Sequence, residues 1–305
     1  MKHIDKNPLR SYFDAYTRRY LQDASPEGVF FPELSSKTTY SNFSKAEYKD
    51  NSIPEGTPYK GWLEVLLAEQ NHLCCYCMRH IEKQDVSVEH LVPESLPMDK
   101  AEEEYDYYAR LSAEIREHVM TGQAFDKWAA GTNVDIANLE KMPHLIAHSN
   151  LFPACNAKRY ACSCNNHRKS ERILPLMLMT DIEGNVEYTE NGEMALLYEE
   201  TEDKMVERTN TALDINSKRL KSIRKLWYKF SRKGVFCEWN HTVTYPEMDN
   251  MVRIALDLAI TDIIPSEYWD LLKEESDGSL KNFQLFLQYN WFYTYYLNKY
   301  PLQQP

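Results

Sequence analysis

Glycine and long apolar stretches are scarce in this sequence. Its 305 residues include 9 glycines, which disfavours glycine-rich phosphate loops and favours helices over tight hairpins. The nucleotide-binding pattern G-x-x-x-x-G-K-[ST] is absent. No stretch approaches the roughly 18 apolar residues that cross a bilayer, and the N-terminal residues lack the apolar core of a signal peptide. We therefore expect a cytoplasmic protein with no membrane segment, in which clustered cysteines stay reduced and bind metal.

Charge of positive sign is also in deficit, since the formal net charge is −11. This balance is unfavourable for a protein that binds nucleic acid. The distribution is uneven, however, because residues 218–233 contain eight lysines or arginines and no acid. We expect Lys221, Arg224 and Lys225 of this segment to contact phosphates. A solvated helix face explains the same pattern equally well.

The remaining composition is that of a folded globular protein, with 43% hydrophobic and 12% aromatic residues. Periodicity and turn residues predict a mainly helical α+β fold. Helices are expected over 59–71, 100–130, from about 165 and over 218–233, with short strands at 77–81 and 86–91. A hairpin is expected over 176–188. The segments are 1–72, a lead-in; 73–175, a core with a helical insertion at about 98–145; 176–233, the hairpin and basic helix; and 234–305, a helical aromatic-rich extension.

Seven cysteines fall mainly into two clusters. Cys74 and Cys77 form a C-x-x-C pair, and 78 residues after Cys77 the second cluster begins. A lone C-x-x-C pair is also typical of a redox dithiol, but two clusters supply the four soft ligands of a tetrahedral structural Zn²⁺. The expected ligands are Cys74, Cys77, Cys155 and Cys164, with Cys162 as the alternative to Cys164. We interpret Cys75 and Cys237 as packed thiols.

Between the clusters lies a short strand that ends in Glu89-His90-Leu91-Val92-Pro93. A carboxylate beside an imidazole at a strand end can place one group on a metal and the other on a water. The pair is weak evidence alone, because most Glu-His dipeptides are surface residues. Two further pieces follow it, Asn150 to Cys155 and Cys164 to Ser170.

Taken in order, these four pieces resemble the HNH endonucleases, the ββα-metal nucleases. The sequence further resembles the HNH component of the Septu and retron anti-phage systems. The features that carry this second resemblance are Trp62 to Gln70 leading into His72-Leu73-Cys74, the wide gap between Cys155 and Cys164, and Thr211 to Asn216 followed by Leu220 and Arg224. The resemblance covers roughly residues 1–233, and only its motif positions are specific. It implies a zinc-stapled ββα-metal core with helical N- and C-terminal elaborations.

The resemblance also implies roles for individual residues. His90 would be the general base, Glu89 would bind one divalent cation (Mg²⁺ or Mn²⁺), and Asn150 would hold the loop that orients the base. A second ligand to that cation is expected just after Cys164, where Asn165 is favoured over His167 and Asn166 also remains open. Arg168 and Lys169 would face phosphates. The implied activity is hydrolysis of phosphodiester bonds, with DNA favoured, beside an ABC/SMC-like ATPase partner.

Two other functions fit the sequence. One is an RNA- or tRNA-cleaving nuclease of the same fold. The other is a non-catalytic zinc-binding interaction module, which would need the four cysteines but not Glu89, His90 and Asn150 in register. The 59 residues between His90 and Asn150 exceed the spacing of compact family members. This acidic insertion would shield the site, dock a partner or be a solvent-exposed segment without a role at the site.

Overall fold

The computed structural model describes residues 1–24, 34–45, 56, 58–131, 134–156, 164–232, 234 and 286–301. Contacts divide the chain into two compact units. The first contains residues 1–76, 81–184 and 198–213, and the second contains 77–80, 185–197 and 214–305. The units are described separately below. None of the helices in the described ranges is long and apolar enough to span a membrane.

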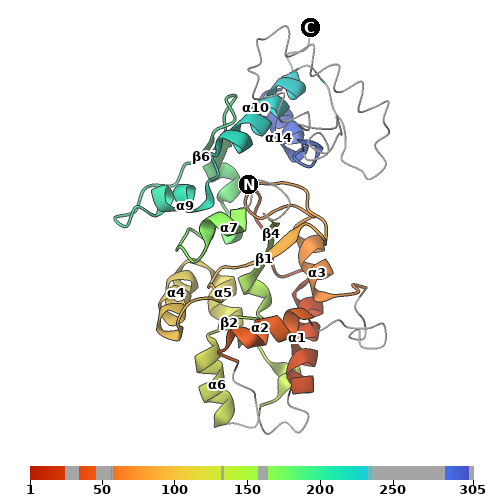
Figure 1. Ribbon diagram of the computed structural model, residues 1–305, viewed down its shortest axis with the longest axis vertical. Coiled ribbons are helices and arrows are strands. Elements are labelled where there is room, and N and C mark those ends of the chain that lie inside the picture. The colour runs from red at the N-terminus through yellow and green to blue at the C-terminus, as the bar shows by residue number, and fades with distance from the viewer. Residues whose placement is uncertain are drawn as a thin grey trace, which may run out of the picture. The chain divides into compact units, whose positions relative to one another are not determined.

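Helices dominate the first unit and surround two very small sheets (Figure 1). The helices are α1 (Arg10–Ala24), α2 (Lys37–Lys45), α3 (Trp62–Glu69), α4 (Met98–Leu111), α5 (Ala113–His118), α6 (Gly122–Ala130), α7 (Cys164–Arg168), α8 (Ile182–Asn185) and α9 (Met205–Leu213). The sequence predicted α3 but not α1 or α2. In α1 the buried face includes Asp14 and Thr17 beside Phe13 and Tyr16, and these polar residues interrupt the apolar period from which a helix is predicted.

The antiparallel strands β1 (Val86–His90) and β4 (Leu151–Cys155) form the longer sheet of this unit, next to α7 (Figure 1). Val86 lies opposite Cys155 and His90 lies opposite Leu151. Every residue of β4 is buried, and α7 packs against this strand. The local order is thus strand, strand, helix. The other strand predicted here is wrong, because residues 77–81 form turns and an isolated bridge.

The insertion after β1 is a compact helical segment rather than one long helix. Ser112 ends α4, and its side chain accepts the backbone N–H of Ile115 at the start of α5. Thr121 caps α6 in the same way through Ala124. These caps stabilise new helix starts, which explains the division of the single helix predicted over 100–130. Strands β2 (Val119–Met120) and β3 (Met142–Pro143) pair in parallel within this segment.

The second unit is built on a hairpin and two helices. Strands β5 (Val186–Tyr188) and β6 (Met194–Leu196) pair antiparallel, so the hairpin predicted over 176–188 is wrong in its position. Its expected turn at Gly184 is part of α8. The true turn uses Gly192, whose φ of +78° suits glycine. A Cβ there would lie 2.0 Å from the Lys221 carbonyl oxygen, so the turn packs directly on α10 (Lys218–Arg232).

Aromatic residues fill the core of this second unit. Trp227 of α10 stacks on Phe286 with ring centroids 4.5 Å apart, and Tyr188 meets Phe292 of α14 (Trp291–Lys299) at 4.9 Å. The prediction of the basic helix over 218–233 is confirmed by α10. Within the predicted helical extension, α14 is the described helix, and most of residues 234–285 lie outside the described ranges.

Candidate metal centre and polar site

The four cysteines chosen from the sequence lie together. Cys74, Cys77, Cys155 and Cys164 are all buried, and their sulfur atoms lie within 4.8 Å of one another. The sulfurs of Cys155 and Cys164 are 3.9 Å apart, close to the roughly 3.8 Å that tetrahedral Zn–S bonds of 2.3 Å require. The backbone N–H of Cys155 also donates to the Cys74 sulfur at 3.3 Å. The chain therefore has a buried four-cysteine cluster that fits a structural zinc.

Of the other three cysteines, Cys75 alone lies in the described ranges. Cys75 is buried, as expected of a packed thiol. Cys162 and Cys237 lie outside the described residues. The choice of Cys164 therefore agrees with the geometry, since its sulfur completes the set at the start of α7.

Asn150 holds the loop that follows β1. It is fully buried, and its Oδ1 accepts the Val92 N–H at 2.7 Å. Its Nδ2 donates to the carbonyls of Val92 at 3.1 Å and His144 at 2.8 Å. The side chain thus satisfies both backbone groups of one residue, as a neighbouring strand would, and joins that residue to the end of the insertion.

His90 ends β1 with its imidazole buried. Its Nε2 lies 3.1 Å from the Leu145 carbonyl, which makes Nε2 the protonated nitrogen and leaves Nδ1 as the acceptor. The ring centroids of Tyr40 and His90 lie 4.4 Å apart, with the two rings nearly perpendicular. Burial lowers the pKa of His90 to about 4, and the bond to Leu145 opposes that shift. The imidazole is therefore neutral at neutral pH and able to accept a proton.

His144 is a second buried histidine beside this site, and the sequence analysis did not select it. Its Nδ1 accepts the Gly122 N–H at 2.9 Å. Burial lowers its pKa to about 3, and the charge of His90 adds to that shift. No local pattern marks this residue in the sequence, because its partners come from the insertion and from β1. The end of the insertion, residues 144–150, therefore forms part of the site.

Glu89 lies next to His90 in β1 but contacts different residues. The residue is 2% exposed, and its Oε1 receives a hydrogen bond from Nη1 of Arg168 at the end of α7. Arg168 is fully buried. The sequence suggested that Arg168 faces phosphates at the surface, but its guanidinium lies in the interior and binds protein groups.

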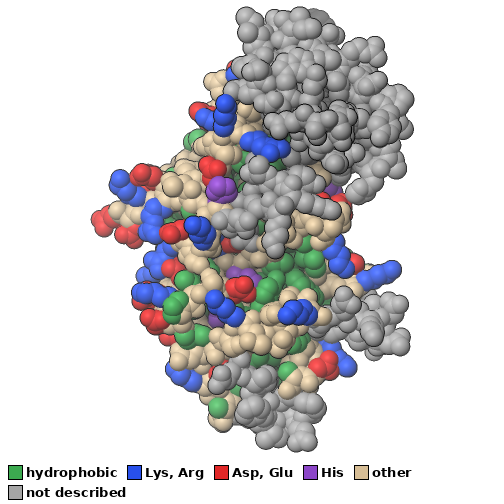
Figure 2. Space-filling view, viewed as in Figure 1, with side chains coloured by type: hydrophobic (Ala, Val, Ile, Leu, Met, Phe, Trp, Pro, Cys, Tyr) green, Lys and Arg blue, Asp and Glu red, His purple; other side chains and the backbone are tan. Residues whose placement is uncertain are grey.

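The other basic residues expected at phosphates divide between surface and interior. Arg224 is fully buried and donates to the carbonyls of Gly192 at 3.3 Å and Ile215 at 2.8 Å. Lys169 is exposed, while Lys221 and Lys225 are half-buried, with Lys221 3.6 Å from Glu193. In the first unit, Figure 2 shows basic and acidic side chains mingled over α4 and α9.

The residues proposed as the second cation ligand are only partly described. His167 is exposed on α7, and the side chains of Asn165 and Asn166 lie outside the described ones. Among the residues that the structure describes, no group of three metal-ligating side chains gathers at Glu89 and His90. A guanidinium already faces the carboxylate. These described residues therefore do not fit a divalent cation.

Comparison with known proteins gave no match among family models, curated proteins or solved structures. The functional argument therefore depends on the motifs and on the geometry above.

Acid sensitivity should reveal the buried state of His144. The pKa is about 3 in the folded protein and about 6.5 in an unfolded chain, so the folded state binds fewer protons between these values. Its stabilising contribution is complete above pH 6.5 and is lost as the pH falls toward 3, by about 1.4 kcal/mol per pH unit. We expect His144→Gln, whose amide oxygen can still accept the Gly122 N–H, to reduce the pH dependence of the unfolding free energy by about one proton.

Urea unfolding at several pH values between 7 and 4 measures this slope. The matched control is His118→Gln. Burial lowers the pKa of His118 as well, but this side chain is half-buried, so its replacement should change the slope less than His144→Gln. An identical slope for the wild type and His144→Gln would contradict the buried neutral state.

Proposed function

We propose that this protein is an HNH-type endonuclease that hydrolyses phosphodiester bonds of nucleic acid, with DNA as the favoured substrate. The observation that supports it best is the geometry of the His90 imidazole at the end of β1, where the hydrogen bond of Nε2 to the Leu145 carbonyl leaves Nδ1 as the proton acceptor. The pairing of β1 with β4, the contact of α7 with β4 and the buried cysteine cluster also support the proposal.

In the proposed reaction His90 is the general base. Its Nε2 keeps its proton and donates a hydrogen bond to the Leu145 carbonyl, while Nδ1 receives a proton from the attacking water. Asn150 holds the backbone of Val92, two residues after the base, and so restrains the chain that carries the imidazole. Glu89 remains paired with Arg168 in this account, because the described residues do not provide the ligand set of a divalent cation.

The resemblance of the sequence to the HNH component of the Septu and retron systems also suggests a biological setting. We place the protein as the effector nuclease of an anti-phage defence system that acts with an ABC/SMC-like ATPase. Lys169, Lys221 and Lys225 remain the candidate phosphate contacts, since Arg168 and Arg224 are buried.

Removal of the imidazole tests the proposal. The wild-type protein with its neighbouring ATPase should cleave plasmid DNA or total tRNA in the presence of Mg²⁺ or Mn²⁺. His90→Ala should reduce kcat by about 10²- to 10⁴-fold, the usual contribution of a general base. His118→Ala is the matched control, because His118 lies at the end of α5 and bonds to Arg10. No cleavage by the wild type, or equal cleavage by His90→Ala, would refute catalysis; a preference for tRNA would change the substrate alone.

One observation favours a second candidate, a zinc-stabilised interaction module without catalysis. Glu89 is buried against Arg168, as expected of a structural ion pair. Stoichiometric zinc together with no cleavage of either polymer would support this reading.

A further inference from the structure

Arg168 uses every donor of its guanidinium. Its Nε donates to the Glu171 carbonyl at 3.1 Å, and Nη1 donates to the His90 carbonyl at 2.8 Å and to Glu89. Its Nη2 donates to the Leu91 carbonyl at 2.7 Å and lies 3.4 Å from the Tyr108 hydroxyl. A lysine has the charge but not this planar fork of donors. The contacts therefore depend on arginine geometry as well as on charge.

These contacts converge on the residues around the proposed base. Arg168 binds the carbonyls of His90 and Leu91, while Asn150 donates and accepts at Val92. The backbone from residue 90 to residue 92 is thus held at three consecutive positions. A shift of the imidazole by about 1 Å costs roughly 100-fold in rate in a typical active site, so this restraint matters for catalysis.

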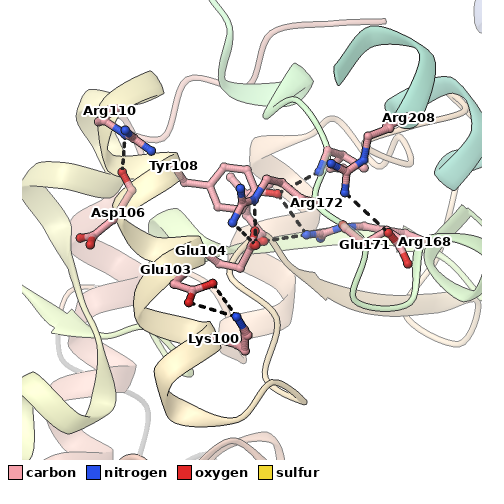
Figure 3. A network of polar contacts seen from close by, with 12 residues as sticks. Lys100, Glu103, Glu104, Asp106, Tyr108, Arg110, Arg168, Glu171, Arg172 and Arg208 are labelled. Carbon is pink, nitrogen blue, oxygen red and sulfur yellow. Dashed lines mark hydrogen bonds and ion pairs between the residues drawn. The ribbon is translucent and has the colours of Figure 1, made fainter. Parts of the chain in front are cut away.

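Charge gives the same assignment. A buried carboxylate without a partner is strongly unfavourable, and a paired one is tolerated. Glu89 has its partner in Arg168, which has 0% side-chain exposure and so cannot face a phosphate in solution. The insertion closes the other side, since the Tyr108 hydroxyl of α4 contacts Arg168 and accepts the Ile173 N–H at 3.2 Å (Figure 3).

We infer that Arg168 is a positioning residue of the proposed nuclease site, which holds Glu89 and the main chain of His90, and is not a phosphate contact. This inference rests on the proposed function. The sequence marked Arg168 only as a basic residue after Cys164, and its acceptors at Glu89, His90 and Leu91 lie 77 to 79 residues earlier in the chain.

Arg172 provides a matched control four residues later. Its Nε and Nη2 bind Glu104 at 2.8 and 2.6 Å, and its guanidinium covers the Tyr107 ring at 4.7 Å (Figure 3). Both arginines thus bind a carboxylate and lie near a tyrosine of α4, but the Glu104 partner of Arg172 belongs to the insertion rather than to β1.

The experiment compares Arg168→Lys and Arg172→Lys in the full chain with its zinc and neighbouring ATPase. Lysine keeps the charge, and thermal unfolding confirms that each variant folds. We expect Arg168→Lys to lower kcat about 100-fold with KM within about twofold, and to leave the salt dependence of DNA binding unchanged. Arg172→Lys should change none of these. A raised KM with unchanged kcat in Arg168→Lys, the signature of a lost substrate contact, would overturn the inference.

A second readout separates this inference from the proposed function. The ¹⁵N imidazole signals of His90, assigned as those missing from His90→Ala, report its tautomer without substrate. Arg168→Lys should change the single Nε2–H tautomer into a mixture, and Arg172→Lys should not. If the wild type cleaves nothing, the proposed function fails and these signals still decide whether Arg168 positions His90. Unchanged signals in Arg168→Lys would refute the positioning role.

Discussion

Cys155→Ser is expected to release the zinc and to abolish the folded state of the first unit. The Cys155 sulfur lies 3.9 Å from that of Cys164, and its residue ends the fully buried strand β4. Structural zinc sites contribute about 10–16 kcal/mol of apparent binding free energy, which is also folding free energy. This is comparable to the whole net stability of a typical protein, roughly 5–15 kcal/mol. Metal analysis and thermal unfolding should show no zinc and no cooperative transition.

Cys75→Ser is the matched control for this prediction, because Cys75 is a buried cysteine next to Cys74 but outside the cluster. It should keep one zinc per chain and lose only the roughly 1–3 kcal/mol typical of a buried polar substitution. A strong chelator should reproduce the effect of Cys155→Ser on the wild-type protein. Equal zinc content in Cys155→Ser and the wild type would refute the metal assignment.

Glu69→Ala should be the most destabilising change outside the cysteine cluster, by about 3–5 kcal/mol. The Glu69 carboxylate lies 2.6 Å from Lys6 Nζ and 3.0 Å from His148 Nε2, and all three side chains are at most 2% exposed. Burial raises the pKa of Glu69, but the charges of Lys6 and His148 outweigh it, so the net shift is downward. Without the carboxylate, the buried Lys6 ammonium loses its counter-ion. It keeps the hydrogen bond from Nζ to the Leu151 carbonyl oxygen at 2.9 Å.

The double variant Lys6→Met/Glu69→Leu distinguishes charge from packing. Replacing a whole buried ion pair by apolar groups is often close to neutral, so this variant should unfold at a higher urea concentration than Glu69→Ala. If the double variant is no more stable than Glu69→Ala, lost packing rather than an unpaired Lys6 explains the destabilisation.

The sequence predicted those parts of the molecule whose signal is local. The C-x-x-C pair and the later cysteines indicated the metal cluster, and the apolar stripe of Leu220, Ile223 and Trp227 indicated α10. A strand ending at His90 followed from apolar alternation closed by Pro93. Each helix or strand pattern depends on residues a few positions apart, and the two cysteine clusters, although 78 residues apart, are marked by a residue type with few other uses. This is why they could be recognised without coordinates.

Long-range contacts explain what the sequence did not show. Arg168 and Arg224 look like surface cations by type, and their burial depends on carbonyl and carboxylate partners that are distant in sequence. His144 lies in an insertion with no motif of its own, and only its bond to Gly122 and its place beside the His90 loop define it. The hairpin was misplaced because its turn was predicted at Gly184. The turn lies at Gly192, where the backbone approaches the Lys221 carbonyl too closely for any residue with a Cβ.

The pairing of β1 with β4 also determines when the protein can fold during its synthesis. Val86 and Cys155 are partners although 69 positions separate them, and such distant pairings form slowly because a long loop must close first. The ribosome must release Cys164 and Arg168 before the metal cluster is complete and Glu89 has its counter-ion. The nascent chain therefore carries His90 without its neighbouring restraints, so the proposed nuclease remains inert until more than half of the chain has emerged.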